Sequence, residues 1–344
     1  MYPRLKAVTR RLRLYLIWTL CVSCATFFIF GCGKSAQTSY EYSGAVSVSK
    51  LVPEATGVIR DGLADERPEV RANAIEVVAA TNRVKLMPKV QRLLKDDFVP
   101  VRFLGALAVG DLEYRLASSE IGRLLGDEDE NVKISAAYAM AKIGSPDSLE
   151  VVRKAIVSND QKVRANAALL LGKSGDRGAL KFLYWALRHE DSDDKVRFQA
   201  AEAIARLGDE RIYPKLWAML ISAYHDDRVF GVRAMGTLGT MEAKNALLTM
   251  LDDDVLEVRL AAAEELGALG ENVGEAEVLD VFRKNLLAGQ GKDDVERVKV
   301  LTALAIGQIC TEPVGRFLPG LLQDESKFVR LAAAKAVFEC TMRD

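Results

Sequence analysis

A basic residue recurs at a nearly constant interval through most of this 344-residue chain. Successive copies are separated by 31, 31, 31, 33, 31, 31, 40 and 31 residues. The nine copies are Arg71, Arg102, Lys133, Arg164, Arg197, Arg228, Arg259, Lys299 and Arg330. A sustained period of this length indicates a repeat protein, in which each unit buries its apolar face only against its neighbours. The period therefore overrides the two compact domains that the length alone would suggest.

The residues around each copy predict a buried helix. With the basic residue as position zero, position −1 is Val in eight copies, and Asp227 is the exception. Position +3 is only Ala, Gly or Thr, and position +7 is always aliphatic or Met. This spacing places one broad apolar stripe along a helix. A second amphipathic segment precedes each copy, as at residues 88–94 and 179–187, so each unit is expected to be two helices and a glycine-marked loop.

An acidic residue six positions before the basic one completes the motif. It is present at Asp65, Asp96, Asp127, Asp191, Asp253, Asp293 and Asp324, and Ser158 and Ser222 replace it. This motif resembles HEAT-like repeats, in particular the short class found in phycobilisome lyase subunits. The resemblance covers about residues 52–344. It implies that the acidic and basic residues form a hydrogen-bonded ladder between successive turns.

We therefore expect an all-α fold, a right-handed α-α superhelix or HEAT-like solenoid of about nine two-helix repeats. The superhelix is expected to be open, with one extended concave face. Stacked at about 9 Å per pair, the units would form a rod or arc of roughly 80 Å.

The N-terminus has the pattern of an export signal. Residues 1–13 are basic and residues 14–31 are almost entirely apolar. The end of the apolar run resembles the lipobox of bacterial lipoproteins, with Ile29, Gly31 and the acceptor Cys32, although Phe30 is bulkier than usual there. We expect residues 1–31 to be a signal peptide, 32–51 a lipidated N-terminus and flexible tether, and 52–344 the solenoid. The alternative is an uncleaved membrane helix, since about 18 apolar residues is near the lower limit for a span.

Both alternatives place the body outside the cytoplasm, because the basic flank stays inside. We expect a lipid-anchored protein of the cell membrane or outer membrane, on the periplasmic side. In such an oxidising compartment Cys310 and Cys340 could form a disulfide. They lie at nearly equivalent places in adjacent units, where helix axes are about 8–10 Å apart. That separation is wide for a disulfide, so two buried free thiols are the favoured interpretation.

Apolar residues at positions +2 and +5 of the second helix suggest a docking surface. These positions are expected to line the concave face, and they hold Leu104, Leu107, Tyr138 and Leu169 in three successive units. Clustered apolar residues in a groove fit a peptide or protein partner. The alternative is that they pack beneath the neighbouring helix.

Position +9 predicts a basic column of Lys142, Lys173 and Arg206. Such a column could meet an acidic protein segment or an anionic polymer. The alternative is a solvated face whose charge is balanced by Glu202 and Asp111.

Charge and histidine content exclude several function classes. Five of the 47 basic residues lie in the first 31 positions, so the rest has 42 basic and 48 acidic residues. A mildly acidic body argues against nucleic-acid binding through bulk charge. Only two histidines occur, and the acidic turns, such as residues 189–194, are explained by helix capping, so we expect no metal and no cofactor.

No catalytic arrangement is visible in the sequence. Deoxyhypusine hydroxylase, another HEAT-like protein, needs several His-Glu pairs, and this chain has only His189-Glu190. Phycobilin lyases share the repeat but are normally cytoplasmic. The expected function is therefore a non-enzymatic, membrane-tethered scaffold or adaptor whose concave face binds a protein or peptide partner in the cell envelope. The alternative is a phycobilin-lyase-like or chaperone-like handler of a cofactor or client protein.

Overall fold

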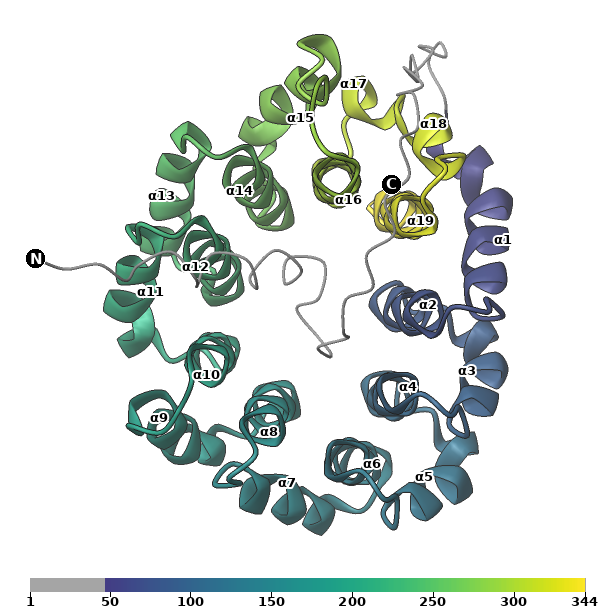
Figure 1. Ribbon diagram of the computed structural model, residues 1–344, viewed down its shortest axis with the longest axis vertical. Helices are drawn as coiled ribbons and strands as arrows, with labels where there is room; N and C mark the ends of the chain where they lie inside the picture. Colours follow the sequence, from purple (N-terminus) through teal and green to yellow (C-terminus); the bar gives the residue numbers. More distant parts are fainter. Residues whose placement is uncertain (1–46, 344) are drawn as a thin grey trace, which may run out of the picture.

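Two concentric layers of helices form the protein, which is represented here by a computed structural model (Figure 1). The structure describes residues 47–343, so Ile29, Gly31, Cys32 and most of the predicted tether lie outside the described residues. Nine two-helix units follow one another around a ring, and no β-strand occurs between residues 47 and 343. The prediction of an all-α solenoid of nine repeats is confirmed. In the same part of the chain, no helix has the length and apolarity needed to cross a membrane.

The outer layer holds the first helix of each unit, which in the ninth unit is split into two short helices, and the inner layer holds the second (Figure 1). The outer helices are α1 (Val52–Gly62), α3 (Met87–Leu93), α5 (Ser118–Leu124), α7 (Leu149–Ala155), α9 (Leu180–Arg188), α11 (Tyr213–Leu220), α13 (Met241–Thr249), α15 (Glu275–Arg283), α17 (Glu312–Gly315) and α18 (Leu318–Leu322). The inner helices are α2 (Pro68–Ala80), α4 (Val99–Asp111), α6 (Glu130–Ile143), α8 (Gln161–Ser174), α10 (Asp194–Arg206), α12 (His225–Leu238), α14 (Leu256–Ala268), α16 (Lys292–Ile309) and α19 (Lys327–Thr341).

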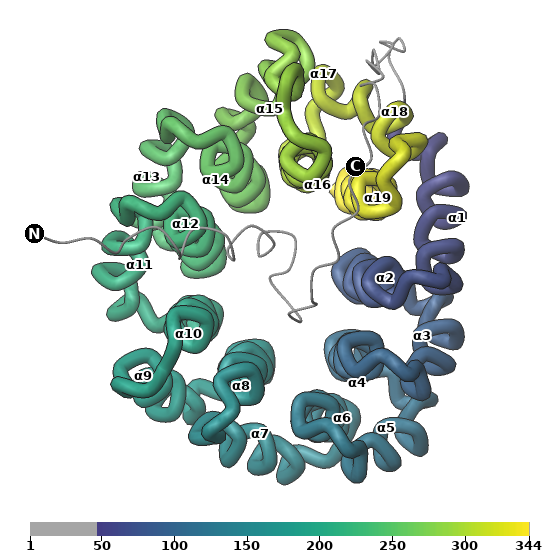
Figure 2. The backbone as a smooth tube through the Cα atoms, viewed as in Figure 1, coloured from purple at the N-terminus to yellow at the C-terminus, as the bar shows by residue number. Residues whose placement is uncertain are grey.

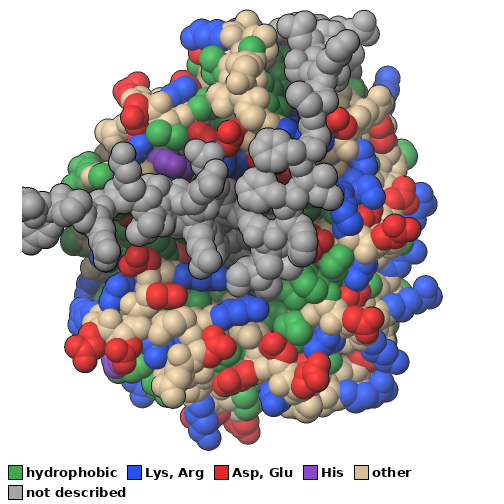
Figure 3. Space-filling model, viewed as in Figure 1, with side chains coloured by type: hydrophobic (Ala, Val, Ile, Leu, Met, Phe, Trp, Pro, Cys, Tyr) green, Lys and Arg blue, Asp and Glu red, His purple; other side chains and the backbone are tan. Residues whose placement is uncertain are grey.

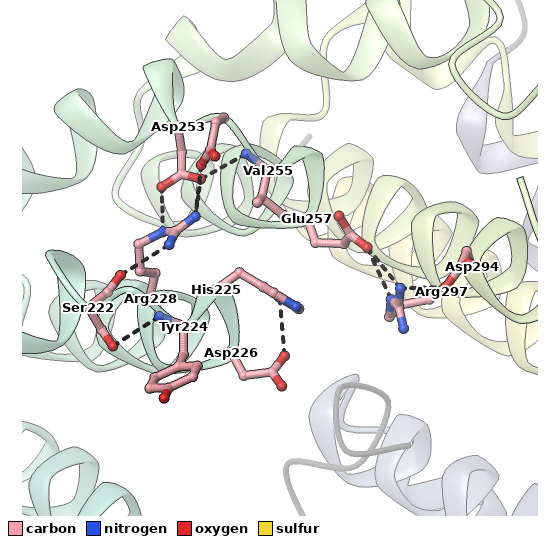
Figure 4. Close-up of polar contacts among 11 residues, drawn as sticks. Ser222, Tyr224, His225, Asp226, Arg228, Asp253, Val255, Glu257, Asp294 and Arg297 are labelled. Carbon is pink, nitrogen blue, oxygen red and sulfur yellow. Dashed lines mark hydrogen bonds and ion pairs between the residues drawn. The ribbon is translucent and has the colours of Figure 1, made fainter. Parts of the chain in front are cut away.

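The residue at position −6 shapes the turn between the two helices of a unit. In seven of the nine units its side chain accepts a hydrogen bond from the backbone N–H two residues later, as from Phe98 N to Asp96 Oδ1 at 3.0 Å. Serine does the same, since Tyr224 N donates to Ser222 Oγ at 3.2 Å (Figure 4). Short Asp and Ser side chains favour this local bond, which explains why either residue supports the turn.

Four rungs of an acid–base ladder join successive turns. In the best-formed geometry, Arg102 donates from Nε and a terminal nitrogen to the two carboxylate oxygens of Asp127, each at 2.9 Å. The same arginine donates to the backbone oxygen of Asp96 in its own unit at 2.8 Å. The four rungs are Arg71–Asp96, Arg102–Asp127, Arg228–Asp253 and Lys299–Asp324. Figure 4 shows the Arg228–Asp253 rung. Each rung therefore joins one turn to the next, and in the three arginine rungs the guanidinium also donates to a backbone carbonyl of its own turn.

Where the spacing between units differs from 31 residues, the basic residue does not pair with the acid that the sequence predicted. Arg164 donates to Ser192 Oγ at 3.2 Å rather than to Asp191, because the 33-residue spacing shifts the next turn. Arg259 donates to Glu277 at 2.7 Å rather than to Asp293. The 40-residue spacing extends α16 back to Lys292, so Asp293 lies in its first turn.

The two serine turns end the ladder locally. Arg197 precedes the Ser222 turn and contacts Asp194 of its own unit at 3.5 Å instead. Lys133 precedes the Ser158 turn, and between residues 47 and 343 it has no ion pair. At the last unit, Arg330 donates to the backbone oxygen of Asp324 at 2.7 Å. The predicted ladder is therefore interrupted where serine replaces the acid, because serine lacks the charge that would hold the basic residue of the preceding unit, Lys133 or Arg197.

The ring closes where the last unit packs against the first, so the prediction of an open arc is wrong. In Figure 2 the yellow end of the chain lies beside the purple beginning. Lys327 of α19 forms an ion pair with Asp65, which precedes α2. The Arg83 guanidinium lies 4.5 Å from the centre of the Phe338 ring. A Cβ added to Gly62 would lie 3.2 Å from Leu331, so α1 and α19 are in close contact.

Glycines at position +8 account for the curvature. A Cβ at Gly172 of α8 would lie 2.7 Å from Ala203 Cβ of α10. A Cβ at Gly307 of α16 would lie 2.7 Å from Ala336 Cα of α19. Missing side chains at these positions let inner helices approach more closely than side-chain-bearing helices can. Because the inner helices lie closer together than the outer helices, the stack of units curves inward until its two ends meet.

The prediction that Cys310 and Cys340 are free thiols is wrong, because their helices also approach closely. Cys310 and Cys340 form a disulfide between the end of α16 and the end of α19, with Cα atoms 5.2 Å apart. The expectation of free thiols assumed ordinary helix spacing. Gly307, one turn before Cys310, removes the side chain that would keep the two helices apart. The disulfide therefore joins the last two inner helices beside the closure of the ring.

Candidate functional site

One position of the repeat contributes to the wall around the centre of the ring in seven of the nine units. Position +5 of the nine inner helices holds Glu76, Leu107, Tyr138, Leu169, Glu202, Arg233, Glu264, Leu304 and Lys335. All of these except Leu169 and Glu202 line a cavity of about 570 Å³. The cavity is bounded by residues of every inner helix except α10. Ring closure thus converts the concave face of the solenoid into a central site.

The cavity wall contains both apolar and charged side chains. Helices α4 and α6 contribute Leu104, Leu107 and Tyr138, and α16 contributes Leu301 and Leu304. Each of the eight inner helices that bound the cavity also contributes one charged residue, namely Glu76, Asp111, Lys142, Lys173, Arg233, Glu264, Arg297 and Lys335. Outside the cavity, the face in Figure 3 has basic and acidic side chains intermingled around the rim. The centre therefore combines apolar wall with a local concentration of charge.

The apolar residues predicted to bind a partner lie on the inner helices but are buried against neighbouring side chains. Leu104, Leu107, Tyr138 and Leu169 are 2%, 4%, 1% and 4% exposed. The Tyr138 ring lies against Gly110 of α4, and its hydroxyl donates to Asp111 at 2.8 Å. Burial and the neighbouring Asp111 charge raise the pKa of Tyr138, so the phenol stays neutral and keeps its proton for this bond. These side chains pack beneath neighbouring helices, the alternative that the sequence left open, and Leu169 does not line the cavity.

The predicted basic column has acidic partners at each level. Lys142 lies 3.8 Å from Glu113, Lys173 lies 3.0 Å from Asp111, and Arg206 lies 2.7 Å from Glu202. Lys142 and Lys173 line the cavity, whereas Arg206 does not. Asp111 and Glu202 are the two acids that the sequence offered as balancing charges. The column is therefore a series of ion pairs rather than a free basic stripe.

Sequence reasoning missed the opposite side of the cavity, which is rich in carboxylates. Glu76 of α2 and Glu264 of α14 line the cavity, and Glu265 and Glu339 lie behind the wall on α14 and α19. Lys335, which also lines the cavity, is 3.4 Å from Glu339. Burial raises the pKa of Glu76 to about 8, and burial together with the Glu264 charge raises the pKa of Glu265 to about 8. Position +5 was the available signal, because it places Glu76 and Glu264 on the same inner face as Leu107.

A second polar cluster lies at the start of α12 (Figure 4). His225 Nδ1 is 3.3 Å from Asp226, and burial raises the pKa of the Asp226 carboxyl. Nearby, Arg297 contacts Glu257 at 3.0 Å and Asp294 at 2.7 Å. Across the described part of the chain, no group of three or more His, Cys, Asp or Glu side chains is arranged to hold a metal ion.

Comparison with known families identifies the repeat. The family described as HEAT repeats matches residues 88–161 and 149–230, and the HEAT repeat family matches residues 244–273. This chain carries HEAT repeats. The matched segments span α3 to α12 and the α13–α14 unit, which are successive parts of the ring. No curated protein matches the chain.

Solved HEAT-type structures resemble the chain at low identity. Human deoxyhypusine hydroxylase in complex with glycerol is 18% identical, with a TM-score of 0.38, over 77% of this chain and 99% of the hydroxylase. The CpcE–CpcF complex of phycocyanin lyase from Nostoc is 16% identical, with a TM-score of 0.41, over 72% of this chain and 93% of the lyase chain. An engineered protein is 18% identical, with a TM-score of 0.30, over 87% and 92% of the two chains.

Proposed function

We propose that this protein is a membrane-tethered, extracytoplasmic scaffold that holds a segment of a partner protein in the centre of its HEAT-repeat ring. The observation that carries the proposal is the closed ring, which directs the +5 positions of seven units into one cavity. A preformed site on rigid helices lowers the ordering cost of binding an extended segment. The proposal assigns no catalytic step to the protein.

The proposed location rests on two independent features. The first is the lipobox-like end of the apolar N-terminal run, with Ile29, Gly31 and Cys32. Diacylation of Cys32 would hold the protein at a membrane, because each buried methylene contributes about 0.8 kcal/mol. The second is the Cys310–Cys340 disulfide, which fits a compartment where disulfides persist.

Intact mass of membrane-extracted protein tests the tether. We expect a mature species that begins at Cys32 and carries added acyl mass. In the Cys32→Ala variant this species should be absent. A chain that begins at Met1 in both samples would contradict the lipid anchor and support the uncleaved membrane helix.

Site-specific photo-crosslinking in intact cells tests the binding site. A photoreactive residue at Ala80 enters the cavity without replacing a packed side chain, since Ala80 lines the cavity and is exposed. A second at Lys142 samples the wall at α6. Leu116, which is 77% exposed and does not line the cavity, is the matched control. We expect one protein to be captured from Ala80 and Lys142 and not from Leu116. Equal capture from all three positions would contradict binding in the centre.

The cavity also supports a second candidate function, the handling of a cofactor or client molecule. Its volume of about 570 Å³ is within the range of small-molecule sites. The phycobilin-lyase-like form of this function predicts that the purified protein retains a chromophore with visible absorption. A colourless protein that does not bind added bilin would exclude that form.

A further inference from the structure

The disulfide between Cys310 and Cys340 holds the unit that closes the ring. Its two cysteines are 30 residues apart and enclose α17, α18 and almost all of α19. These elements form the ninth unit, whose inner helix α19 carries the contacts with the first unit. One of those contacts, between Phe338 and Arg83, lies two residues before Cys340. The disulfide therefore fixes the C-terminal end of the helix on which closure depends.

The ninth unit has the shortest outer helices between residues 47 and 343. Helix α17 has 4 residues and α18 has 5, whereas the outer helices of the other eight units have 7 to 11 residues. A short outer helix buries less apolar surface against its inner helix, so it contributes less to holding that helix in place. The disulfide thus adds a covalent restraint to the unit with the shortest outer helices.

Cys310 occupies a backbone position that favours glycine. It is position +11 of its unit, just after α16, and it has φ 55° and ψ 23°, in the left-handed region. A residue with a side chain is less stable than glycine in this conformation. The end of the helix alone would therefore favour glycine, and the cysteine is explained by its bond to Cys340. Residues with positive φ at position +11 of the other units are Asn82, Glu113, Gly144, Gly175, Gly208, Gly239 and Gly270.

The two sulfur atoms differ in how easily a second thiol could reach them. Cys340 is 3% exposed, whereas Cys310 is half-buried. Thiol–disulfide exchange begins when a thiolate attacks a sulfur atom that it can reach, and strained or exposed disulfides exchange most readily. The left-handed backbone and the partial exposure of Cys310 make this end of the disulfide the point of attack.

We propose that the Cys310–Cys340 disulfide is a reducible clamp, and that a dithiol reductant opens the ring by breaking it. A thiolate of the reductant attacks the Cys310 sulfur, and Cys340 leaves as a thiolate that takes up a proton. The second thiol of the reductant then attacks the mixed disulfide, gives its proton to the released Cys310 and leaves the reductant as a disulfide. Two electrons thus pass from the dithiol to the protein, and α19 loses its covalent link to α16.

Breaking the clamp would change the central cavity, because α16 and α19 both line it. Leu301 and Leu304 of α16 border the cavity, and so does Lys335 of α19. This inference deepens the proposed function, on which its consequence for the partner rests, by making partner binding depend on the oxidised state. In a compartment where disulfides persist, the closed ring is the resting form.

Hydrogen exchange of the full chain before and after treatment with dithiothreitol tests the clamp. We expect amide exchange in α1 and α19 to become at least about tenfold faster after reduction, as loss of a typical disulfide implies. Exchange in α8 and α10, which lie across the ring from α19 (Figure 1), should not change. Unchanged exchange in α1 and α19, with reduction confirmed by alkylation and intact mass, would overturn the proposal. So would a disulfide that is reduced only when denaturant unfolds the protein.

Cys310→Gly is the decisive variant. It removes the disulfide but supplies the residue that suits the left-handed backbone, so the end of α16 keeps its conformation. We expect exchange in α1 and α19 of this variant to match that of the reduced wild type, with or without dithiothreitol. Exchange as slow as in the oxidised wild type would contradict the clamp.

Cys32→Ala is the matched control, because it removes a cysteine outside the disulfide. We expect it to respond to dithiothreitol as the wild type does. Loss of the response in Cys32→Ala would mean that the reductant acts elsewhere, and it would overturn the proposal.

Photo-crosslinking from Ala80 separates this inference from the proposed function. Capture of a partner by the wild type and its loss in Cys310→Gly would support both. Equal capture by the two proteins, together with equal exchange, would reject the clamp and leave the proposed scaffold standing. Faster exchange on reduction, without capture from Ala80 in either protein, would support the clamp and reject binding in the centre.

Discussion

Two contacts between neighbouring units, called joints here, can be compared. One joins α4 to α6, and the other joins α19 to the first unit and closes the ring. The helices pack in the same way at both, but the chain connects the two units directly only at the first. In the first, Arg102 and Asp127 are 25 residues apart and form a two-bond rung, and Gly110 lies against Tyr138. In the second, Lys327 and Asp65 are 262 residues apart, and Gly62 lies against Leu331. Only the internal joint is supported by a short connecting chain. The closing joint must therefore be held by side chains alone, and it should be the first joint to open.

Loss of an internal rung should have the largest effect. Arg102 is nearly buried, and its ion pair holds the pKa of Asp127 low, although burial alone would raise it. Arg102→Ala leaves a carboxylate and two backbone carbonyls without their donor, so we expect a loss of about 3–4 kcal/mol in the free energy of unfolding. Lys133→Ala, at the same repeat position but without an ion pair among residues 47–343, should cost less than about 0.5 kcal/mol. Chemical denaturation measures both, and equal losses would contradict the structural role of the rung.

Adding a side chain at a glycine between two inner helices should have the second-largest effect on stability. A Cβ at Gly172 would lie 2.7 Å from Ala203 Cβ, so Gly172→Ala must push α8 and α10 apart. We expect a loss of about 2 kcal/mol and a larger ring radius in small-angle scattering. Gly122→Ala in α5 has no atom within 4 Å and should gain up to about 1 kcal/mol from helix propensity. A stabilised Gly172→Ala protein would show that close approach is not what curves the ring.

The closing joint should also respond to pH through Glu76, which faces Lys335 of α19. Burial raises the pKa of Glu76 from 4.5 to about 8, despite the opposing charge of Lys335. Because the folded-state pKa is the higher one, this carboxyl makes folding less favourable as the pH rises from about 4.5 to about 8. Glu76→Gln should therefore add about 2 kcal/mol of stability above pH 8 and almost none below pH 5. Unfolding curves at several pH values check this, and a gain that is independent of pH would contradict it.

The repeat unit, its helices and its inward-facing positions could be predicted because they depend on local periodicity. Val101 and Gly105 fix the buried face of α4, and position +5 then points to the centre. The closed ring could not be predicted, because curvature depends on how deeply residues such as Ala203 pack onto Gly172 in the neighbouring unit. The disulfide could not be predicted for the same reason, because it requires α16 and α19 to lie closer together than helices usually do. The sequence identified Leu107 as an inward-facing residue of the candidate site. That Glu264 lines the same cavity could be seen only once the ring was known to close.

Weakening the closing ion pair should have the smallest effect on global stability. The Lys327 side chain is 42% exposed, so Lys327→Ala should cost about 1 kcal/mol or less. The pair with Lys327 lowers the pKa of Asp65 against the raising effect of burial, so its contribution should disappear as the pH falls through that lowered pKa. Hydrogen exchange should nevertheless increase in α1 and α19 and not in α4 and α6. Faster exchange at α4 and α6 would contradict the ranking of the joints.

A crosslink across the closure tests the ring most directly. Cysteines introduced as Asp65→Cys and Lys327→Cys replace two side chains in contact, and a short bismaleimide should join them within one molecule at high yield. The control has Asp65→Cys and Glu190→Cys. Residue 190 follows α9, which lies across the ring from α1 and α2 (Figure 1), so these two cysteines should not be joined. Peptide mass spectrometry identifies the linked residues. Efficient linkage of 65 to 327 in the monomer would support the closed ring and its central cavity, and its absence, with both cysteines reactive, would mean an open arc.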